Sequence, residues 1–220
     1  MAGRGSGLLQ TVWAGTLDLL FPPRCLVCDA LAEPFCAECR GEVQPVGPDA
    51  LLPPLLRDVR SAGYHAGPLR SAVLRLKFER KVALLDPLAE LLAAELESHL
   101  PAWRADALLP VPIHWLRRLE RGFNQSELLA EEVARRTGLP LSRALRRVRK
   151  TPHQVGLPRE RRQENLVGAF AVSPGETVGG RRFVLLDDVR TTGATLTECA
   201  RTLRAAGAEE VYGLTVTYDA

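Results

Sequence analysis

Segment 184–196 carries the residues best suited to chemistry. Residues 184–186 are apolar and predict a buried strand, and the adjacent carboxylates of Asp187 and Asp188 follow it. Ligands of open α/β sheets bind beyond the carboxyl ends of the strands. Carboxylates at that edge accept hydrogen bonds from ribose hydroxyls or coordinate Mg²⁺. The next residues open a predicted helix, whose unpaired N–H groups and dipole favour a phosphate. They are Thr191, Thr192, Gly193, Ala194 and Thr195.

One ligand fits both halves of this segment, namely a ribose 5-phosphate. Its diol would face the two aspartates, and its phosphate would bind the threonine-rich loop. Two other interpretations remain open at this point. An apolar strand that ends in aspartates also resembles the Mg²⁺ strand of a P-loop ATPase, although the chain has no G-x-x-x-x-G-K-[ST] motif. Alternatively, Asp188 caps a turn and the threonines cap the helix.

A second group with chemical potential is a cluster of cysteines near the N-terminus. Two Cys-x2-Cys pairs, separated by seven residues, offer four soft ligands for a tetrahedral zinc ion. Disulfides or free thiols are the alternatives, but a cytosolic protein disfavours disulfides. Four protein ligands leave no open coordination position, so we expect a structural site. The ligands are Cys25, Cys28, Cys36 and Cys39, whereas the isolated Cys199 predicts a small buried residue.

The elements that must position these residues follow from periodicity and from glycine and proline. Residues 60–66 and 107–111 predict strands, and helices are expected after Pro68, over 87–100 and over 125–137. Further elements are a strand over 182–186, a loop over 187–193, a helix over 194–206 and a strand over 211–216. Strand, loop, helix and strand in this order form one right-handed crossover of a parallel sheet.

Composition and charge restrict the class of protein. The 220 residues are 46% hydrophobic and 25% charged, which argues against a disordered, coiled-coil or collagen-like chain. The net charge of +3 is unevenly spread, since segment 114–162 has 13 basic and 5 acidic residues. No apolar run reaches the roughly 18 residues of a membrane span. Residues 8–21 predict an amphipathic helix rather than a secretion signal, so we expect a cytoplasmic protein.

Taken together, these motifs resemble a known family. Segment 184–196 is similar to the phosphoribosyl pyrophosphate (PRPP) signature of type I phosphoribosyltransferases. The order of motifs along nearly the whole chain resembles the ComF family of competence-associated phosphoribosyltransferase-like proteins. The positions that carry this resemblance are the four-cysteine motif, Tyr64, Lys77, Phe78, 110–114, 121–125, Thr151, Gln154, Arg162, Asn165 and 168–170.

The resemblance implies a fold and a set of site residues. It implies an α/β fold, with a type I phosphoribosyltransferase-like parallel sheet flanked by helices and a small N-terminal zinc-ribbon-like module. We expect an N-terminal helix and zinc module over 1–44, a proline-rich linker over 45–58 and the phosphoribosyltransferase-like domain over 59–220. Asp187 and Asp188 match the family's ribose-binding acids, which we assign as catalytic, and the loop of threonines matches its 5-phosphate loop. Weaker candidates for pyrophosphate or acceptor contacts are Arg118, Arg121, Asn124, Gln125, Gln154 and Arg162.

Arg190 departs from the family pattern, because such signatures usually hold an aliphatic or aromatic residue there. It either contacts a phosphate or pairs with a neighbouring acid. The aperiodic stretch 151–165 is a candidate lid over the reactive centre. His114 and His153 are candidates for acid–base work, although single histidines are more often structural.

The implied activity is displacement of pyrophosphate from ribose C1 by a nitrogen nucleophile, with Mg²⁺ bound to PRPP and no covalent protein nucleophile. A binding module without catalysis is the alternative. In that case the basic 114–162 region would contact single-stranded DNA or the DNA-uptake and recombination proteins of natural transformation. No residue pattern identifies the acceptor.

Overall fold

Four parallel strands form the central sheet of the structure, which is a computed structural model. It describes residues 22–47, 50–114, 116, 119, 122–149 and 166–220. The strand order is β1-β6-β5-β2, and non-consecutive neighbours are joined by crossovers. The carboxyl ends of all four strands therefore meet at one edge. The strands are β1 (Val59–Tyr64), β2 (Ala107–Pro110), β5 (Arg182–Arg190) and β6 (Glu210–Tyr218).

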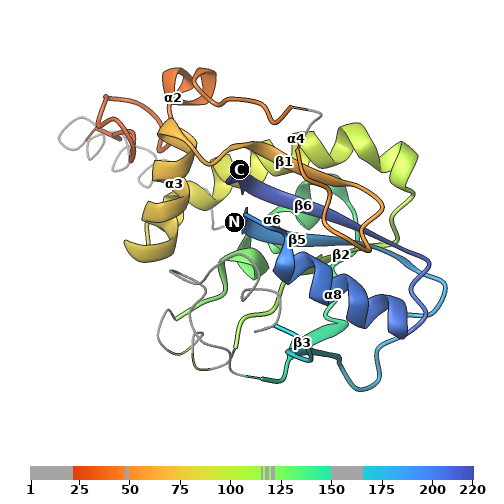
Figure 1. Cartoon of the computed structure of the whole chain (residues 1–220). Helices are drawn as coiled ribbons and strands as arrows, with labels where there is room; N and C mark the ends of the chain where they lie inside the picture. Colours follow the sequence, from red (N-terminus) through yellow and green to blue (C-terminus); the bar gives the residue numbers. More distant parts are fainter. Residues whose placement is uncertain (1–21, 48–49, 115, 117–118, 120–121, 150–165) are drawn as a thin grey trace, which may run out of the picture.

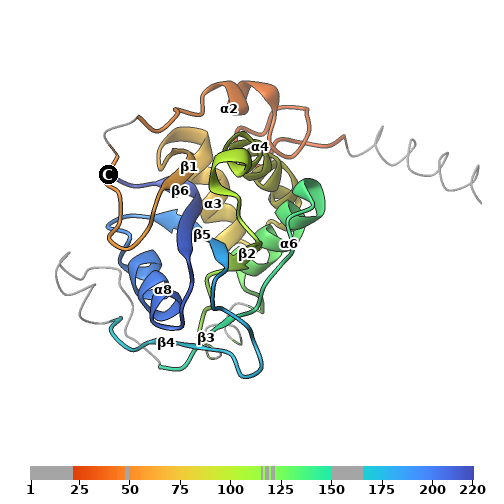
Figure 2. The same cartoon turned by 90° about the vertical axis from the view of Figure 1, so that its right-hand side faces the viewer.

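Helices cover both faces of this sheet (Figures 1 and 2). Helix α8 packs on one face, and α4 and α6 pack on the other, with α3 beside them. A short 3₁₀ turn, η1, leads from α3 into α4. The bounds are α3 (Gly67–Phe78), η1 (Val82–Leu84), α4 (Leu85–Trp103), α6 (Gln125–Thr137) and α8 (Ala194–Ala205).

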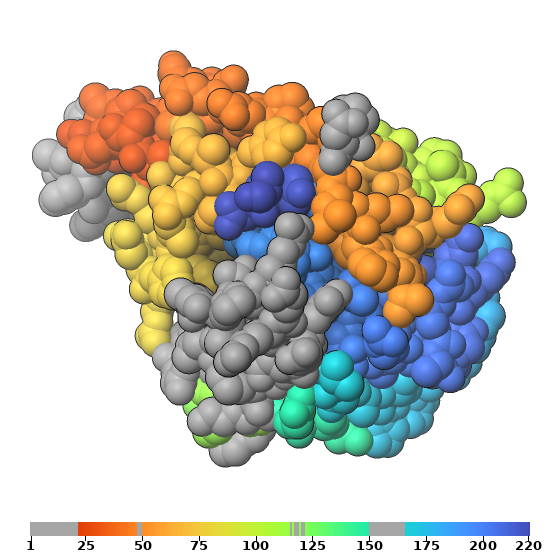
Figure 3. All heavy atoms as spheres, in the orientation of Figure 1, coloured from red at the N-terminus to blue at the C-terminus, as the bar shows by residue number. Residues whose placement is uncertain are grey.

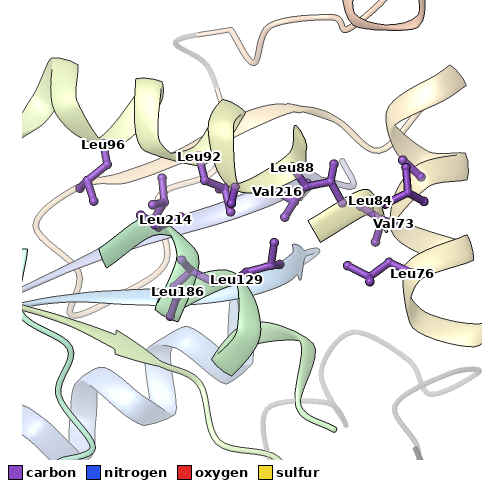
Figure 4. Packing of buried hydrophobic residues seen from close by; sticks show 14 of the residues in the cluster. Val73, Leu76, Leu84, Leu88, Leu92, Leu96, Leu129, Leu186, Leu214 and Val216 are labelled. Atoms are coloured by element: carbon purple, nitrogen blue, oxygen red, sulfur yellow. The ribbon is translucent and has the colours of Figure 1, made fainter. Parts of the chain in front are cut away.

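The core explains why residues 183–186 form a strand without polar positions. Successive side chains of a strand point to opposite faces of the sheet. Val184 and Leu186 accordingly join the cluster under α4 and α6, whereas Phe183 and Leu185 join the cluster under α8. All four are fully buried. Figure 4 shows the first cluster, in which leucines of α4 and α6 meet the sheet.

The sequence predictions of several elements are confirmed. Helix α6 has the predicted bounds, 125–137, and ends at Gly138 in the left-handed conformation that favours glycine. Helix α4 is longer than predicted at both ends. It continues past Leu100 to Trp103, whose ring stacks on Tyr212 with 4.7 Å between centroids. In the described part of segment 45–58, no helix or strand occurs, as predicted.

One prediction about elements was wrong, and one strand had not been predicted. The loop expected over 187–193 is mostly strand, because β5 continues to Arg190 and pairs with β6 as far as Arg190–Tyr218. Only Thr191, Thr192 and Gly193 remain as the loop before α8. The unpredicted strand is β3 (Leu145–Arg147), which lies in a segment rich in arginine and pairs antiparallel with β4 (Phe170–Val172). Pairing with a distant segment, which local periodicity does not record, decides both cases.

The cysteine-rich N-terminal segment packs against the rest of the chain. It includes the short helix α2 (Ala37–Gly41), which contacts α3. Phe35 and three of the cysteines belong to the same core cluster as Leu69, Val73 and Leu76 of α3. In addition, Arg40 Nη1 donates to Glu90 Oε2 on α4 at 2.7 Å. The helix expected over 8–21 lies outside the described residues.

Candidate functional site

The two aspartates lie near the carboxyl end of β5, where the crossover leaves an edge open to ligands. Ser126, in the first turn of α6, donates its hydroxyl to Asp187 Oδ1 at 2.9 Å. The backbone N–H of Asp188 donates to the same oxygen, also at 2.9 Å. On the other side, Lys77 Nζ lies 2.8 Å from Asp188 Oδ2. Two elements distant in sequence, α6 and α3, therefore orient the acid pair together with the backbone of β5.

The electrostatics of the pair differ from those of ordinary surface carboxylates. Burial raises the pKa of Asp187 to about 7, and the neighbouring Asp188 contributes in the same direction. Lys77, the N–H of Asp188 and the hydroxyl of Ser126 oppose this rise of the pKa. Near neutral pH, both the protonated and the ionised form of Asp187 are therefore populated. A cation or a hydrogen-bond donor at this position would favour the ionised form.

The threonine-rich loop leads directly from this strand into α8. Gly193, the N-cap of α8, has φ 74°, a left-handed conformation that disfavours residues with a Cβ atom. No side chain caps the helix, although Ala194 N donates to Thr192 Oγ1 at 3.3 Å. Helix N-termini of this kind bind anions through unpaired N–H groups. The loop therefore has the backbone chemistry that a phosphate requires.

The linker segment packs on this loop. A Cβ atom on Gly193 would lie 2.3 Å from Pro53 Cγ, so the proline ring lies directly against the glycine. The backbone of Leu51 is bound to the ends of β5 and β6. Its carbonyl oxygen accepts a hydrogen bond from Arg190 Nη1, and its N–H donates to Tyr218 Oη at 3.4 Å. In Figure 3 the linker (orange) and α3 (yellow) flank the C-terminal residues (dark blue) on this face.

Of the two roles expected for Arg190, the pairing with a neighbouring acid is not found among the described residues. Its side chain is almost fully buried, and its guanidinium lies 3.8 Å from the centroid of the Tyr218 ring. Burial lowers the pKa of Arg190. Among the described residues, its contacts are an aromatic ring and a backbone carbonyl, not a carboxylate. The arginine therefore attaches the linker to the end of the sheet.

The weaker candidate contacts are only partly placed by the structure. Asn124 and Gln125 are buried at the start of α6, where Asn124 Nδ2 donates to Val111 O at 3.2 Å. Asn124 Oδ1 is buried and has no hydrogen-bond partner within the described residues. The other candidates, Arg118, Arg121, Gln154 and Arg162, lie outside the described residues, as do His153 and the candidate lid 151–165. His114 is described and buried.

Sequence reasoning missed three residues around the acid pair. Ser126 and Lys77 contact the aspartates directly, and His65 follows β1 at the same edge of the sheet. His65 Nδ1 lies 2.8 Å from Thr217 Oγ1, and burial lowers the pKa of the histidine. The resemblance to the family included Lys77 but gave it no role. The position of His65 just after a strand was the available signal, because ligands bind at that edge.

The four clustered cysteines have the geometry of a tetrahedral metal site. Cys25 Sγ lies 3.8 Å from Cys39 Sγ, and Cys28 Sγ lies 3.6 Å from Cys36 Sγ. All four sulfur atoms lie within 4.8 Å of one another. A tetrahedron with Zn–S bonds of about 2.3 Å requires sulfur atoms about 3.8 Å apart. All five cysteines of the chain are described, and none forms a disulfide.

The thiols in this cluster differ in how readily they ionise. Burial disfavours ionisation of Cys25, but N–H groups of Cys28, Cys36 and Val27 lower its pKa to about 6. Burial and the neighbouring thiols raise the pKa of Cys39 well above its ordinary value. Because zinc binds thiolates, binding of the metal would release protons from the cluster. Cys199, in contrast, is a fully buried thiol in α8, as predicted.

Comparison with known proteins agrees with both parts of the chain. Residues 16–50 match the double zinc ribbon domain, and residues 124–219 match the phosphoribosyl transferase domain. Competence protein F of Haemophilus influenzae is 34% identical over 188 residues, which cover 81% of this chain and 82% of that protein. The chain belongs to the competence protein F family. Its fold is that of a type I phosphoribosyltransferase with an N-terminal zinc ribbon.

Other relatives of this competence protein F family member have related names. DNA utilization protein YhgH of Escherichia coli (strain K12) is 37% identical over 72% of this chain and 70% of its own length. Competence protein ComFC of Bacillus subtilis is 29% identical over 70% of this chain and 60% of its own length. Among solved structures, the glutamine PRPP amidotransferase from B. subtilis matches with a TM-score of 0.45 and 23% identity, over 66% of this chain and 30% of that one. None of the described helices combines the length and apolar character of a membrane span.

Proposed function

We propose that this protein binds PRPP or ribose 5-phosphate, with Mg²⁺, at the carboxyl edge of β5. The observation that carries the proposal is the succession of two features along the chain. Strand β5 holds two adjacent carboxylates near its end, and the uncapped N-terminus of α8 follows a few residues later. Asp187 and Asp188 would accept hydrogen bonds from the ribose diol. The 5-phosphate would bind the loop Thr191, Thr192, Gly193, Ala194 and Thr195.

The chemistry of the donors fits Mg²⁺, which prefers carboxylate oxygens together with water and phosphate oxygens. Asp188 and Asp187 would hold the ion, and bound Mg²⁺ would supply positive charge next to the sugar and its phosphates. Asn124 and Gln125 lie at the start of α6, near Ser126, and would line the pyrophosphate or acceptor side. We assign the same side to Arg118, Arg121, Gln154 and Arg162.

The first experiment is calorimetric titration of PRPP in the presence of Mg²⁺. The double substitution Asp187→Asn with Asp188→Asn should abolish Mg²⁺-dependent binding, because the amides lose the negative charge that holds the ion. Asp106→Asn is a matched control, since Asp106 contacts Arg182 N at the opposite edge of the sheet. Unchanged affinity in the double variant would contradict the proposal.

We further propose that the site transfers the phosphoribosyl group. A nitrogen nucleophile would form a bond to ribose C1 while the C1–oxygen bond to pyrophosphate breaks and pyrophosphate leaves with its electron pair. Positioning and charge stabilisation would account for most of the rate acceleration. A screen for PRPP-dependent pyrophosphate release, across nucleobases and simple amines, tests this step. Binding of PRPP without release in any reaction would identify a regulatory rather than a catalytic site.

The cysteine cluster is proposed to hold structural zinc, because its spacing matches a tetrahedral site with no open position. Elemental analysis should find one zinc ion per chain. Cys25→Ser should lose the metal and destabilise the N-terminal module, because the segment has little core of its own. Cys199→Ala removes a thiol that is remote from the cluster and should keep the zinc. A zinc-free protein of unchanged stability would refute the assignment.

A second function is favoured by the names of the relatives and by the charge of segment 114–162. We propose that this region binds single-stranded DNA, or proteins of DNA uptake and recombination, in a cytoplasmic step of natural transformation. Neutralised phosphates release counterions, so the affinity for single-stranded DNA should fall steeply as salt rises. A titration of a fluorescent oligonucleotide at several salt concentrations measures the slope. Binding that is independent of salt, or no binding at all, would exclude single-stranded DNA as the partner of this region.

A further inference from the structure

The ion pair between Lys77 and Asp188 has no role in the proposed function as stated so far. Lys77 Nζ lies 2.8 Å from Asp188 Oδ2, and the side chains are only 21% and 14% exposed. An ion pair at the surface contributes little to stability and is easily exchanged for water. A shielded pair costs desolvation energy and is often no more stable than an apolar pair. Stability alone is therefore a weak explanation for it.

Helix α3 fixes the position of Lys77 beside the acid pair. The lysine lies in the last turn of α3, whose Leu69, Val73 and Leu76 are buried in the core. The next residue, Phe78, is 66% exposed. The helix therefore turns Lys77, and not its neighbour, toward the acid pair.

The two aspartates are held in different ways. Asp187 accepts from Ser126 and from the backbone of Asp188, and these donors belong to the fixed framework. Within the described residues, the ion-pair partner of the Asp188 side chain is Lys77, a charged group on a long, flexible side chain. An ammonium group and a divalent ion compete for the same carboxylate oxygens. Asp188 is therefore the acid whose partner can be exchanged.

We propose that Lys77 is a positioning residue that supplies the acid pair with a cation until a divalent ion replaces it. Lys77 and the divalent ion are then alternative partners of Asp188, and each weakens binding of the other. Without a divalent ion, the ammonium group would supply the positive charge beside the anionic oxygens of the ligand, and a bound divalent ion would take over that role. The second part of this inference rests on the proposed sugar-phosphate function, whereas the competition for Asp188 does not.

The first test uses Mn²⁺ alone as the probe, with its binding followed by electron paramagnetic resonance. Lys77→Met removes the competing charge, so the affinity for Mn²⁺ should rise at least about fivefold, the lower end of ordinary coupling between two ligands. Lys77→Arg keeps the charge and should behave like the wild type. The added affinity should vanish in Lys77→Met with Asp188→Asn. Equal Mn²⁺ affinity in wild type and Lys77→Met would overturn the proposal.

The second test titrates ribose 5-phosphate with and without Mg²⁺. In magnesium-free buffer, Lys77→Met should bind the sugar phosphate at least about fivefold more weakly than the wild type, and saturating Mg²⁺ should remove most of that difference. A lysine that only supports the fold would weaken binding equally in both buffers, which contradicts the proposal. If Lys77→Met does not fold, Lys77→Gln carries the same test. If the wild type binds no sugar phosphate, the proposed function fails while the Mn²⁺ result still decides the role of Lys77.

Discussion

At the scale of single residues, the environment of Asp187 has a consequence for stability. Burial and Asp188 raise its pKa from 3.8 to about 7 in the folded protein. The unfolded chain therefore releases its proton at lower pH than the folded chain does. The contribution of Asp187 to stability is present below about pH 4 and is lost as pH rises toward and above 7.

Asp187→Asn should remove this loss, because an amide does not ionise. Relative to the wild type, the variant should gain on the order of 2–4 kcal/mol in its free energy of unfolding between pH 4 and pH 8. Urea unfolding in magnesium-free buffer at several pH values measures the difference. Parallel pH profiles for the two proteins would show that Asp187 titrates normally in the fold.

At the scale of elements, the junction between β5 and α8 depends on a glycine for two separate reasons. Gly193 has φ 74°, and a Cβ atom there would also lie 2.3 Å from Pro53 Cγ. Gly175 offers a control, since its φ is 80° and nothing lies within 4 Å of its ideal Cβ position. The two sites therefore separate backbone strain from steric contact.

Gly175→Ala should cost about 1 kcal/mol of unfolding free energy from the left-handed backbone alone. Gly193→Ala should cost about 1–3 kcal/mol more, because the linker must move away from α8. Pro53→Gly combined with Gly193→Ala should recover most of the excess. Equal losses at the two glycines, measured by urea unfolding, would show that the linker does not press on the loop.

The elements also show what local sequence can predict. Helix α6 follows from the spacing of its apolar residues, since Leu129, Ala130 and Val133 are buried on one face. The end of β5 could not be found in this way, because its polar residues are held by pairing with β6. Asp187, Asp188 and the loop share one short segment and were visible as a motif. Ser126 and Lys77 reach them from elements far away in the chain, so only the fold brings them together.

At the scale of the whole molecule, the cysteine-rich module and the acid pair are connected through α3. The module packs on one part of this helix, and Lys77 extends from its last turn to Asp188. We expect loss of the metal to disorder the module and to expose the part of α3 on which it packs. We therefore expect the two sites to be coupled energetically, although their ligands do not meet.

Cys25→Ser should accordingly weaken the binding of ribose 5-phosphate as well as remove zinc, by about fivefold or more if the coupling is of ordinary size. The effect should appear at temperatures where circular dichroism shows that the parallel sheet is still folded. Cys199→Ala should leave zinc content unchanged and serves as the cysteine control. Full sugar-phosphate affinity in a zinc-free protein would show that α3 is held by the sheet alone.

The attachment of the linker by Arg190 bears on how this protein should be divided for experiments. A fragment that begins at β1 would lack Leu51 and Pro53, so the guanidinium of Arg190 would lose its carbonyl acceptor and Gly193 its cover. Swapping the N-terminal module between relatives at a junction in this segment would disturb the same edge of the sheet. Loss of ligand binding in such fragments or chimaeras would therefore report damage to the loop before α8, not a contribution of the zinc ribbon. The residues between the two modules are best kept together with the phosphoribosyltransferase domain.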